Sequence, residues 1–435
     1  MKISVIGLGY LGATHAVAMA KLGHQVIGID NDQAKVASLS RGKVPFFEPG
    51  LSQALAEVLA DGSITFQQEH NQHSASAELH FLCVGTPQQP DGSANTDYLF
   101  AAIRDLAPQL SAESLVVGKS TVPVGTASRL RDELAGKAGF EPKLVWNPEF
   151  LREGTALEDS LSPDRIVIGA WNRSDAEKLL QAYKPILDRG TPLVEVDVQT
   201  AELVKVAANA FLATKVSFIN AMAEIAEASG ADAVALADAI GYDERIGNKY
   251  LRTGIGFGGG CLPKDIRGFV ARANELGVGS SLDFLVEVDK VNQRRRQRVV
   301  ELAKLELGDL AGKRIAILGI AFKPDSDDLR DSPALEIARM LSAAGAKVTV
   351  TDPEALAGVG DEALTTEPDV MAALSGAELV ILGTEWRQYR DLDPAAAAEQ
   401  VATKTVIDGR NVLDVSSWQQ AGWCVIALGR NIDNG

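Results

Sequence analysis

Apolar and polar positions alternate regularly along the first 170 residues. Short aliphatic runs are separated by longer segments in which an apolar residue recurs every three or four positions. The short runs predict buried strands and the longer segments predict helices. The runs lie at residues 2–6, 24–30, 79–85, 114–120, 143–146 and 165–169. Strands that alternate with helices predict a mostly parallel, doubly wound sheet.

The pattern changes at residues 200–229, which contain no Gly or Pro and are rich in alanine. Apolar residues on all sides predict a long helix that is buried on several faces, a spacer between domains and a dimer surface. A second alternating block follows, with strand-like runs at 313–321, 346–353, 377–384 and 404–411. We therefore expect an α/β chain of two Rossmann-like, doubly wound domains joined by a long central helix. The expected domains are residues 1–197, 198–300 and 301–435.

Composition narrows the possible classes of function. The 435 residues exceed what one core holds. The formal net charge of −16 disfavours a nucleic-acid partner, because phosphates need a basic surplus. We expect no membrane span and no cleavable signal peptide, since the strand at 2–6 leads directly into a glycine motif. The three cysteines are far apart and predict neither a disulfide framework nor a metal site. A cytoplasmic location is the simplest expectation.

The first strand is followed by a glycine fingerprint. Gly7, Gly9 and Gly12 form GxGxxG between a strand and a helix, which predicts a turn that accepts a pyrophosphate at the helix N-terminus. Asp30 ends the second strand, where a carboxylate accepts from ribose hydroxyls and repels the extra phosphate of NADP. The expected cofactor is NAD; a purely structural turn is the alternative. Lys35 is either a ribose contact or a solvated helix residue.

A cysteine lies in the most informative run, GIGFGGGCLPKDIR at 254–267. Five glycines precede Cys261, and Pro263 is expected as the first residue of a helix. A thiol just before a helix N-terminus, with Lys264 nearby, favours the thiolate. With the carboxylate of Asp265 in the same turn, these are the parts of a covalent active site. A glycine-rich turn with an inert structural cysteine is the alternative.

Further polar groups follow strands or punctuate the long helix. Thr86 and Thr121 end two strands, as ligands or as turn residues. A short helix is predicted at residues 147–154, with Asn147 as its cap. Glu149 and Glu153 would share one face of it, either to activate water or as solvated side chains.

The long helix carries two isolated polar residues, Lys205 and Asn209, one turn apart. Together they could donate to an oxyanion. A lysine that reaches solvent and an asparagine bonded to backbone are the alternatives.

Eight motifs, in this order, resemble the UDP-glucose/GDP-mannose dehydrogenase family: GLGYLG, FLCVGTP, KSTVPVGT, NPEFLREG, AELVKVAANAFL, RIGNKYL, GFGGGCLPKD and AFKPDSDDLRDSP. The resemblance covers residues 1 to about 412 and is greatest to the UDP-glucose-oxidising members. It implies oxidation of the sugar CH₂OH to a carboxylate with two NAD⁺, through a thiohemiacetal and a thioester on Cys261. Lys205, Asp265 and a water near Thr121 would move protons, Lys205 and Asn209 would stabilise oxyanions, and Glu149 would serve hydrolysis.

The resemblance also assigns binding residues. Those for the cofactor are Gly7, Gly9, Tyr10, Leu11, Gly12, Asp30, Lys35, Thr86, Thr121, Glu153, Lys264 and Arg330. Those for the substrate, UDP-glucose, are Glu149, Phe150, Leu151, Lys205, Asn209, Arg245, Tyr250, Phe257, Gly258, Cys261, Phe322 and Lys323, with Arg245 reaching across the interface of a homodimer or higher homo-oligomer. Glu48 would shape the site and Arg410 would lie near the substrate. Gly260, where the family often has another residue, would add room beside the thiol.

Other functions remain open at this stage. A two-electron hydroxyacid dehydrogenase also combines a Rossmann domain with a long helix but needs no thiol. A catalytically silent nucleotide-sugar sensor would bind without forming NADH. Within the family, GDP-mannose and UDP-N-acetylhexosamine dehydrogenases share these motifs.

Overall fold

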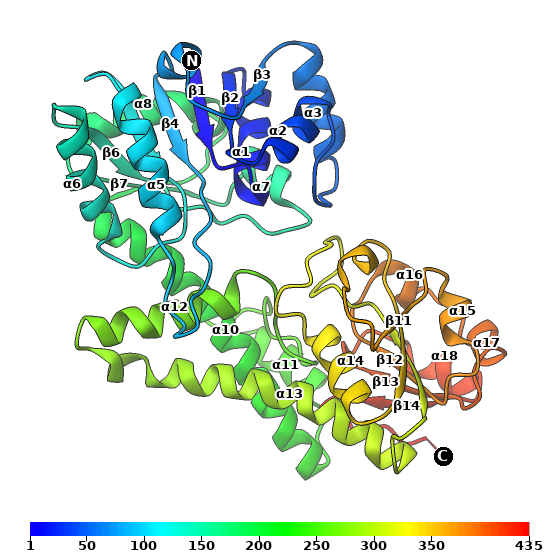
Figure 1. Cartoon of the computed structure of the whole chain (residues 1–435). Helices are drawn as coiled ribbons and strands as arrows, with labels where there is room; N and C mark the ends of the chain where they lie inside the picture. The colour runs from blue at the N-terminus through cyan, green and yellow to red at the C-terminus, as the bar shows by residue number, and fades with distance from the viewer. Residues whose placement is uncertain (435) are drawn as a thin grey trace. The chain divides into compact units, whose positions relative to one another are not determined.

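The computed structural model describes residues 1–434 and divides into two compact units (Figure 1). The first unit comprises residues 1–208 and 267–279. The second comprises residues 209–266 and the chain from 280 onward. The three-domain division expected from the sequence, with boundaries after residues 197 and 300, stays a prediction.

The sheet of the first unit has the strand order β3-β2-β1-β4-β5-β6-β7-β8. Its strands are β1 (Lys2–Ile6), β2 (Gln25–Ile29), β3 (Ile64–Gln67), β4 (Leu79–Leu82), β5 (Leu115–Gly118), β6 (Lys143–Trp146), β7 (Ile166–Ala170) and β8 (Leu193–Val196). Neighbours pair in parallel except β6 and β7, which are antiparallel. The chain order reverses between β1 and β4, so the carboxyl ends of these strands form the crevice in which ligands of such sheets bind.

Helices cover both faces of this sheet. They are α1 (Tyr10–Lys21), α2 (Gln33–Ser40), α3 (Leu51–Ala60), α4 (Gln72–Ala75), α5 (Asp97–Leu106), α6 (Thr126–Ala138), α7 (Ala156–Leu161), α8 (Arg173–Ala182) and α9 (Lys184–Leu187), with a 3₁₀ turn η1 (Ala107–Gln109). Alternate residues of a strand point to opposite faces. Leu115 and Val117 of β5 therefore join a core with α1, α3 and α8, whereas Val116 joins a core with α5 and α6.

The helix α10 (Val198–Ser229) confirms the long helix expected at 200–229. By length and composition it could cross a bilayer, so the expectation that no segment qualifies was wrong for this one. It is also packed as a core helix: the buried carboxylate of Glu202 accepts the N–H groups of Gly125 at 2.7 Å and Ala127 at 2.6 Å, at the start of α6. Burial raises the pKa of Glu202, and these two bonds oppose that rise.

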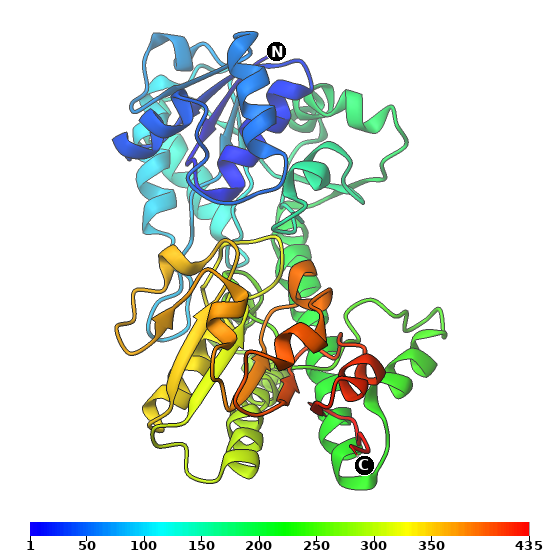
Figure 2. The same ribbon diagram turned by 90° about the vertical axis from the view of Figure 1, so that its right-hand side faces the viewer.

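The second unit contains a parallel sheet of order β11-β10-β9-β12-β13-β14, the same winding as in the first unit. Its strands are β9 (Arg314–Leu318), β10 (Lys347–Thr351), β11 (Thr365–Thr366), β12 (Leu379–Leu382), β13 (Thr405–Asp408) and β14 (Cys424–Ala427). The helices after α10 are α11 (Ala233–Gly241), α12 (Leu262–Glu275), α13 (Asp283–Leu307), α14 (Pro333–Ala343), α15 (Val370–Leu374), α16 (Arg387–Arg390), α17 (Pro394–Ala398) and α18 (Val415–Gln420), with 3₁₀ turns η2 (Gly279–Leu282) and η3 (Leu356–Gly358). Buried residues of α13 join the core of this sheet, which α13 flanks in Figure 2.

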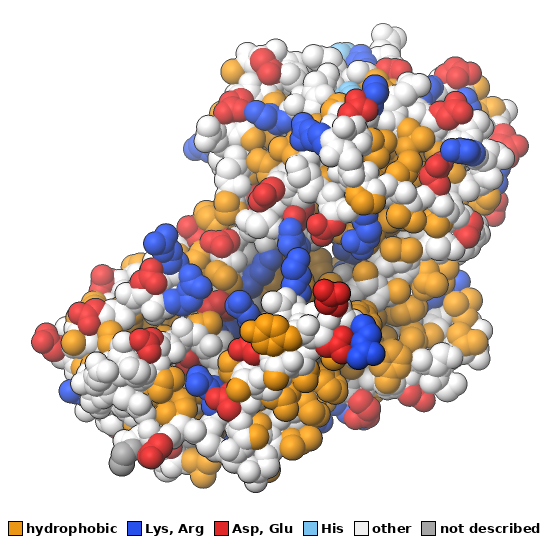
Figure 3. Space-filling model, turned by 180° about the vertical axis from the view of Figure 1, so that it is seen from behind, with side chains coloured by type: hydrophobic (Ala, Val, Ile, Leu, Met, Phe, Trp, Pro, Cys, Tyr) orange, Lys and Arg blue, Asp and Glu red, His pale blue; other side chains and the backbone are white. Residues whose placement is uncertain are grey.

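The expected α/β architecture of two Rossmann-like sheets and a long helix is confirmed. Observed strands are up to four residues shorter than the apolar runs that predicted them, because the runs extend into the turns at their carboxyl ends. The sequence patterns missed β3, β8, β11 and β14, which lie at the edges of the two sheets and are at most partly buried. On the face seen in Figure 3, acidic side chains are spread over the surface, as expected from the net charge of −16.

Alanine at two glycines of the first unit is expected to change the free energy of unfolding in opposite directions. A Cβ on Gly118, in β5, would lie 2.1 Å from the buried Trp146 ring, whereas one on Gly136, exposed in α6, would meet nothing within 4 Å. We expect Gly118→Ala to lower the free energy of unfolding by about 1–3 kcal/mol through overpacking. Gly136→Ala should raise it by about 0.5–1 kcal/mol through helix propensity. Urea midpoints that moved in the same direction would contradict this packing.

Candidate functional site

The turn between β1 and α1 has the form that a dinucleotide requires. Gly7 has a φ of 87°, and a Cβ on Gly12 would lie 1.8 Å from the Gly7 carbonyl oxygen, so both positions require glycine. A Cβ on Gly9 would meet nothing within 4 Å, so open space lies beside the residue that begins α1. An approaching pyrophosphate would fill that space and accept from the first N–H groups of the helix. The fingerprint residues therefore fit NAD.

Asp30 follows β2 and is buried at the same sheet end. Its Oδ2 accepts the Leu8 N–H at 2.7 Å and the Lys35 ammonium at 2.8 Å, and its Oδ1 accepts the Asp32 N–H at 3.0 Å. Lys35 forms an ion pair with Asp30, so it is not simply a solvated helix residue, and its contact with the ribose stays a prediction. The carboxylate is thus held in place at the strand end where a ribose would bind.

Glu48 connects the dinucleotide turn to the loop after β6. Its carboxylate accepts the N–H groups of Gly154 and Ala156, each at 2.7 Å, and the Tyr10 hydroxyl donates to it. Burial, and then the hydrogen bond to Glu48, raise the pKa of Tyr10. Tyr10 therefore joins the start of α1 to Glu48 and the loop after β6. Its contact with the cofactor stays a prediction. Leu11 follows it in the same helical turn, partly buried against the first core.

The helix predicted at 147–154 does not form, and that prediction was wrong. The Asn147 amide, expected as a helix cap, is buried and donates instead to the Val167 carbonyl at 2.8 Å. Its Oδ1 accepts from Lys119 at 3.0 Å and from the Tyr183 hydroxyl at 2.7 Å. Because the Asn147 side chain bonds to these distant groups, it is not available to cap a helix. Proline at 148 also disfavours a helical conformation of Asn147, so residues 147–154 form no helix. Glu149 and Glu153 therefore do not share a helical face.

Glu149 and Lys205 form a buried ion pair, with Glu149 Oε1 2.9 Å from Lys205 Nζ. The pair is closed on the loop side by the Leu151 N–H, which donates to Glu149 Oε2 at 2.6 Å. The Phe150 ring lies between two cations, with Lys205 Nζ 5.7 Å and the Arg165 guanidinium 3.8 Å from its centroid. The alternative of Lys205 reaching solvent is therefore excluded by its burial.

Thr86 and Thr121 lie at the carboxyl ends of β4 and β5, as expected. The Thr86 hydroxyl donates to the Thr121 carbonyl at 2.7 Å, which joins the two strand ends. This contact matches the turn-residue alternative for Thr86 and leaves the Thr121 hydroxyl for a water or ligand role.

In the second unit, Cys261 is exposed and lies directly before α12. Its carbonyl accepts the Asp265 N–H at 2.9 Å, so it caps the helix, and its sulfur lies where the helix dipole favours a thiolate. The helix begins at Leu262, so Pro263 is its second residue rather than its first. A carboxylate one turn on, Asp265, is buried and accepts from Asn209 and Lys264, each at 2.6 Å.

Sequence patterns missed the residues that hold the glycine run, because α13 reads as a solvated charged helix. Asn292 Oδ1 accepts the Phe257 N–H at 2.8 Å, and its Nδ2 donates to the Phe257 carbonyl at 2.9 Å. A Cβ on Gly256 would lie 2.2 Å from Asn292 Oδ1, so this position requires glycine. Arg295, fully buried, donates to the Gly254 carbonyl at 3.3 Å. Asn292 and Arg295 continue the three- to four-residue spacing of the apolar Val288 and Val299, and that spacing is the sequence signal that could have found them.

The remaining glycines of the run allow close contact with the loop after β9. A Cβ on Gly259 would lie 2.8 Å from the Phe322 ring, and one on Gly260 would lie 2.3 Å from the Arg330 guanidinium. The room expected at Gly260 is therefore occupied by Arg330, which corrects that prediction. Arg330 is itself held by Asp328 through bonds of 2.7–3.0 Å.

The other residues assigned by resemblance lie in loops of the second unit. Arg410 donates to the carbonyls of Gly256 at 3.2 Å and Phe322 at 3.1 Å, so it joins the two loops. Lys323 lies 5.4 Å from the centroid of the Phe322 ring.

Two residues lie apart from these contacts. Arg245 pairs with Asp243 and its side chain is 88% exposed, while Tyr250 has a φ of 62° and is partly exposed. Gly258 is buried, and a Cβ on it would lie 2.3 Å from the Asp331 carbonyl oxygen.

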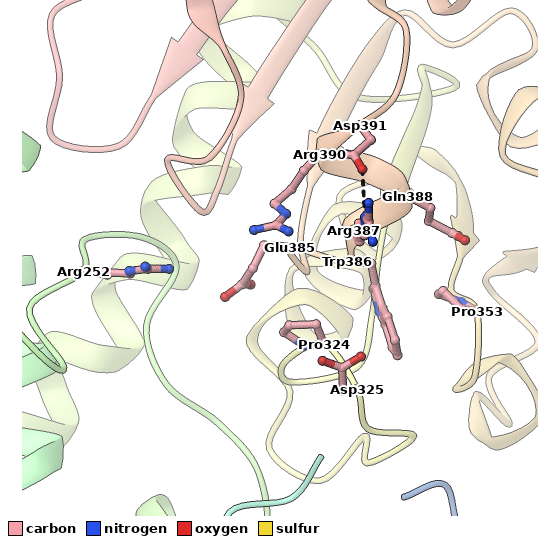
Figure 4. A pocket seen from close by; sticks show the side chains of 10 residues that line it. All are labelled: Arg252, Pro324, Asp325, Pro353, Glu385, Trp386, Arg387, Gln388, Arg390 and Asp391. Carbon is pink, nitrogen blue, oxygen red and sulfur yellow. Dashed lines mark hydrogen bonds and ion pairs between the residues drawn. The ribbon is translucent and has the colours of Figure 1, made fainter. Parts of the chain in front are cut away.

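A cavity of about 650 Å³ opens at the carboxyl end of the second sheet. Figure 4 shows Arg252, Glu385 and Arg390 at one side of it and Trp386 at another, with an ion pair between Arg387 and Asp391. Its size suits a ligand as large as a nucleotide. Within residues 1–434, no group of His, Cys, Asp and Glu side chains could hold a metal ion.

Three family models match the chain in sequence order. They are the NAD binding domain of the UDP-glucose/GDP-mannose dehydrogenase family at residues 1–187, its central domain at 199–294 and its UDP binding domain at 316–415. This chain belongs to the UDP-glucose/GDP-mannose dehydrogenase family. The resemblance drawn from the motifs and the expected NAD cofactor are thereby confirmed.

Relatives and solved structures agree with this membership. A UDP-glucose 6-dehydrogenase of Bacillus subtilis is 38% identical over 99% of this chain and 98% of its own length. One from Rhizobium meliloti is 38% identical over 99% of this chain and all of its own. The structure of a UDP-glucose dehydrogenase from Pyrobaculum islandicum matches with a TM-score of 0.90 and 39% identity, covering 99% of this chain and 98% of that one. A UDP-D-ManNAc dehydrogenase from Pyrococcus horikoshii matches with 0.86 and 25%, covering 99% of each.

The position of Asp30 generates a binding prediction. Asp30→Ala should weaken NAD⁺ binding about tenfold or more, since a charge-assisted hydrogen bond to ribose is lost. It should also narrow the preference for NAD⁺ over NADP⁺, because the repelling charge is removed. Isothermal titration with both nucleotides measures this. Asp32→Ala, which removes a carboxylate that only caps α2, is the matched control; equal NAD⁺ affinity in the two variants would contradict the assignment.

Proposed function

We propose that this protein is an NAD-dependent UDP-glucose 6-dehydrogenase that oxidises the sugar CH₂OH to the carboxylate of UDP-glucuronate through a covalent bond to Cys261. The observation that carries the proposal is an exposed cysteine at the N-terminus of α12, followed one turn later by a buried carboxylate held by Asn209 and Lys264. Membership in the family supports the redox chemistry. The names of the relatives support UDP-glucose as the sugar nucleotide.

Two oxidations and one hydrolysis account for every atom. NAD⁺, when bound, accepts a hydride from the sugar C6 in each oxidation. In the first, the hydroxyl proton passes to solvent through a water near Thr121 as an aldehyde forms, and Asp265 and Lys205 assist this transfer. The Cys261 thiolate then adds to the aldehyde carbon and gives a thiohemiacetal, whose oxyanion Lys205 and Asn209 stabilise.

The second oxidation converts the thiohemiacetal to a thioester. Water then adds to the thioester carbon, the carbon–sulfur bond breaks, and the thiolate returns to Cys261. Glu149 serves this step by taking a proton from water, and its ion pair with Lys205 orients it. The net reaction consumes one water and two NAD⁺ for each carboxylate formed.

Sugar-nucleotide binding is proposed for Phe150 and Leu151 in the loop after β6. The same role is proposed for Tyr250, Phe257, Gly258, Phe322 and Lys323, as the family resemblance implies. Glu153, Lys264 and Arg330 would contact the cofactor. The cavity that Arg252, Arg390 and Trp386 line has the cations and the ring that a nucleotide needs.

Two rival functions are distinguished by stoichiometry. A two-electron hydroxyacid dehydrogenase would release one NADH per substrate, and a silent sensor none. Among nucleotide sugars, 38% identity to UDP-glucose enzymes, against 25% to a UDP-D-ManNAc enzyme, favours UDP-glucose.

The covalent mechanism predicts the effect of removing the thiol. Wild-type protein should release two NADH per UDP-glucose, and Cys261→Ser should lower UDP-glucuronate formation by roughly three orders of magnitude or more. The control is Cys424→Ser, at a half-buried thiol in β14, which should leave the rate unchanged. Product release would be followed by NADH absorbance and by mass spectrometry of the nucleotide sugar.

An adduct on the protein is the second readout. Intact-mass analysis during turnover of a slow substrate should show the sugar nucleotide on Cys261 of the wild type and none on Cys261→Ser. Near wild-type product formation by Cys261→Ser would end the covalent mechanism.

We further propose a homodimer formed through α10. Phe211, Phe218 and Ile225 lie seven residues apart on this helix, and each is at least half exposed. Residues at this interval lie on one face and form the kind of apolar stripe that helices pair through. Arg245, exposed in the segment after α11, would then reach the neighbouring subunit's sugar.

The dimer proposal predicts an effect of charge on the stripe. Phe218→Glu should raise the dimer dissociation constant about thirtyfold or more, as for a buried aromatic anchor. Leu305→Glu, at a still more exposed apolar residue of α13 outside the stripe, should not. Light scattering after size-exclusion chromatography measures the mass; a monomeric wild type would refute the proposal.

A further inference from the structure

A buried lysine, Lys119, lies at the end of β5 and has no part in the steps above. It is 7% exposed, and its ammonium donates to Asn147 Oδ1 at 3.0 Å. The remaining bonds of Asn147, to Tyr183 and Val167, fix its amide. Lys119 is therefore held against the first residue of the segment that carries Glu149.

A small cavity in the first unit is lined by both Lys119 and the proposed base, Glu149. Lys119, Asn147, Glu149 and Phe150 all line one small cavity of about 60 Å³. On its other side, Glu149 pairs with Lys205 at 2.9 Å. The Glu149 carboxylate is thus paired with one buried ammonium group, Lys205, and lines the same small cavity as a second, Lys119.

Three of the titratable groups around Lys119, namely Cys83, Tyr183 and His15, are neutral near pH 7. Burial raises the pKa of Cys83 to about 12, and burial also raises the pKa of Tyr183. Burial, and then the charge of Lys119, lower the pKa of His15. The groups that face Lys119 are His15 of α1, Cys83 after β4, Glu149 after β6, Tyr183 after α8 and Lys205 of α10. Of these groups, Glu149 and Lys205 carry charge; Asp159, Asp164 and Arg165 also line the cavity.

Burial also lowers the pKa of Lys119, to about 8, with the Glu149 charge opposing the fall and the Lys205 charge adding to it. The lysine is thus charged at neutral pH and loses its proton within an accessible pH range.

We propose that Lys119 is a positioning residue for the oxidation, which holds the Glu149 segment through Asn147 and supplies the positive charge that lets Lys205 release its proton while Glu149 stays ionised. This inference rests on the proposed function, since the ionisation of this cluster matters only if protons move there during turnover. A second positive charge near Lys205 disfavours its protonated form, and the same charge favours an ionised carboxylate.

The test compares Lys119→Met with Lys119→Arg, which keeps the charge. We expect Lys119→Met to lower kcat for NADH formation from UDP-glucose about ten- to a hundredfold, with KM changed less than about threefold. Without the charge, its neighbours hold their protons more tightly, so the low-pH limb of the rate profile should move up by about one pH unit. The difference from wild type should shrink above pH 9, where wild-type Lys119 is itself neutral. Lys119→Arg should keep the wild-type limb.

Stability separates this role from a structural one. The folded-state pKa of Lys119 lies below its ordinary value, so the buried charge opposes folding at pH values below 8, and this penalty fades as pH rises. Lys119→Met should therefore melt no lower than wild type at pH 7, since Asn147 Oδ1 keeps the Tyr183 hydroxyl. Lys119→Gln is the second neutral variant should Met not fold. Lys143→Met, at a partly exposed lysine of β6, is the control and should match wild type throughout.

Three outcomes would overturn the inference. They are an unmoved low-pH limb in both neutral variants, a rate loss in Lys119→Arg as large as in Lys119→Met, or a rate loss that only follows a fall in melting temperature. Wild-type protein that forms no UDP-glucuronate would overturn the proposed function and this inference together. Active wild-type protein with an unmoved limb in the variants would overturn the inference alone.

Discussion

A charged side chain that leaves water inside this chain must find a partner, and that requirement shapes the loops at the strand ends of both units. Burial of an unpaired charge is prohibitively unfavourable, whereas a carboxylate that accepts several N–H groups is stable. Glu48 holds the loop after β6, and Glu202 caps α6. In the second unit, Asp408 accepts the N–H groups of Val412 and Leu413 and shapes the turn that carries Arg410.

The two sheets share one arrangement of a carboxylate and a turn. In both, a carboxylate after the second strand of the winding accepts backbone N–H groups from the turn after the first strand. Asp30 accepts from Leu8, and Asp352 accepts from Ile320 and Ala321. The Trp386 indole also donates to Asp352 at 3.2 Å and helps bury it. The turn after β9 lacks the glycine fingerprint that follows β1. Of the two sheet ends, the first therefore offers a dinucleotide both an open helix N-terminus and a fixed carboxylate acceptor.

The glycines before Cys261 work by close packing more than by an open approach. Several of them lie where a Cβ would collide with backbone, with Asn292 or with the Phe322 ring. The thiol is therefore presented by a segment that is fixed by its neighbours in the second unit, and the exposed sulfur marks the end of that fixed segment. Preorganisation of this kind is what a covalent mechanism needs from its nucleophile.

Local sequence determined much of this protein. Apolar periodicity gave the two parallel sheets and the long helix, and the glycine fingerprint with Asp30 gave the cofactor site, because each depends on residues close together in the chain. The cysteine before a helix was equally visible. Tertiary structure decided where side chains with several suitable partners would bond. Asn147 could cap a helix by its local sequence, yet its amide bonds Lys119, Tyr183 and Val167, which are 20 or more residues away. The pairing of Lys205 with Glu149, and of Asn209 with Asp265, likewise depends on which distant segments burial brings within reach, and no periodicity encodes that choice.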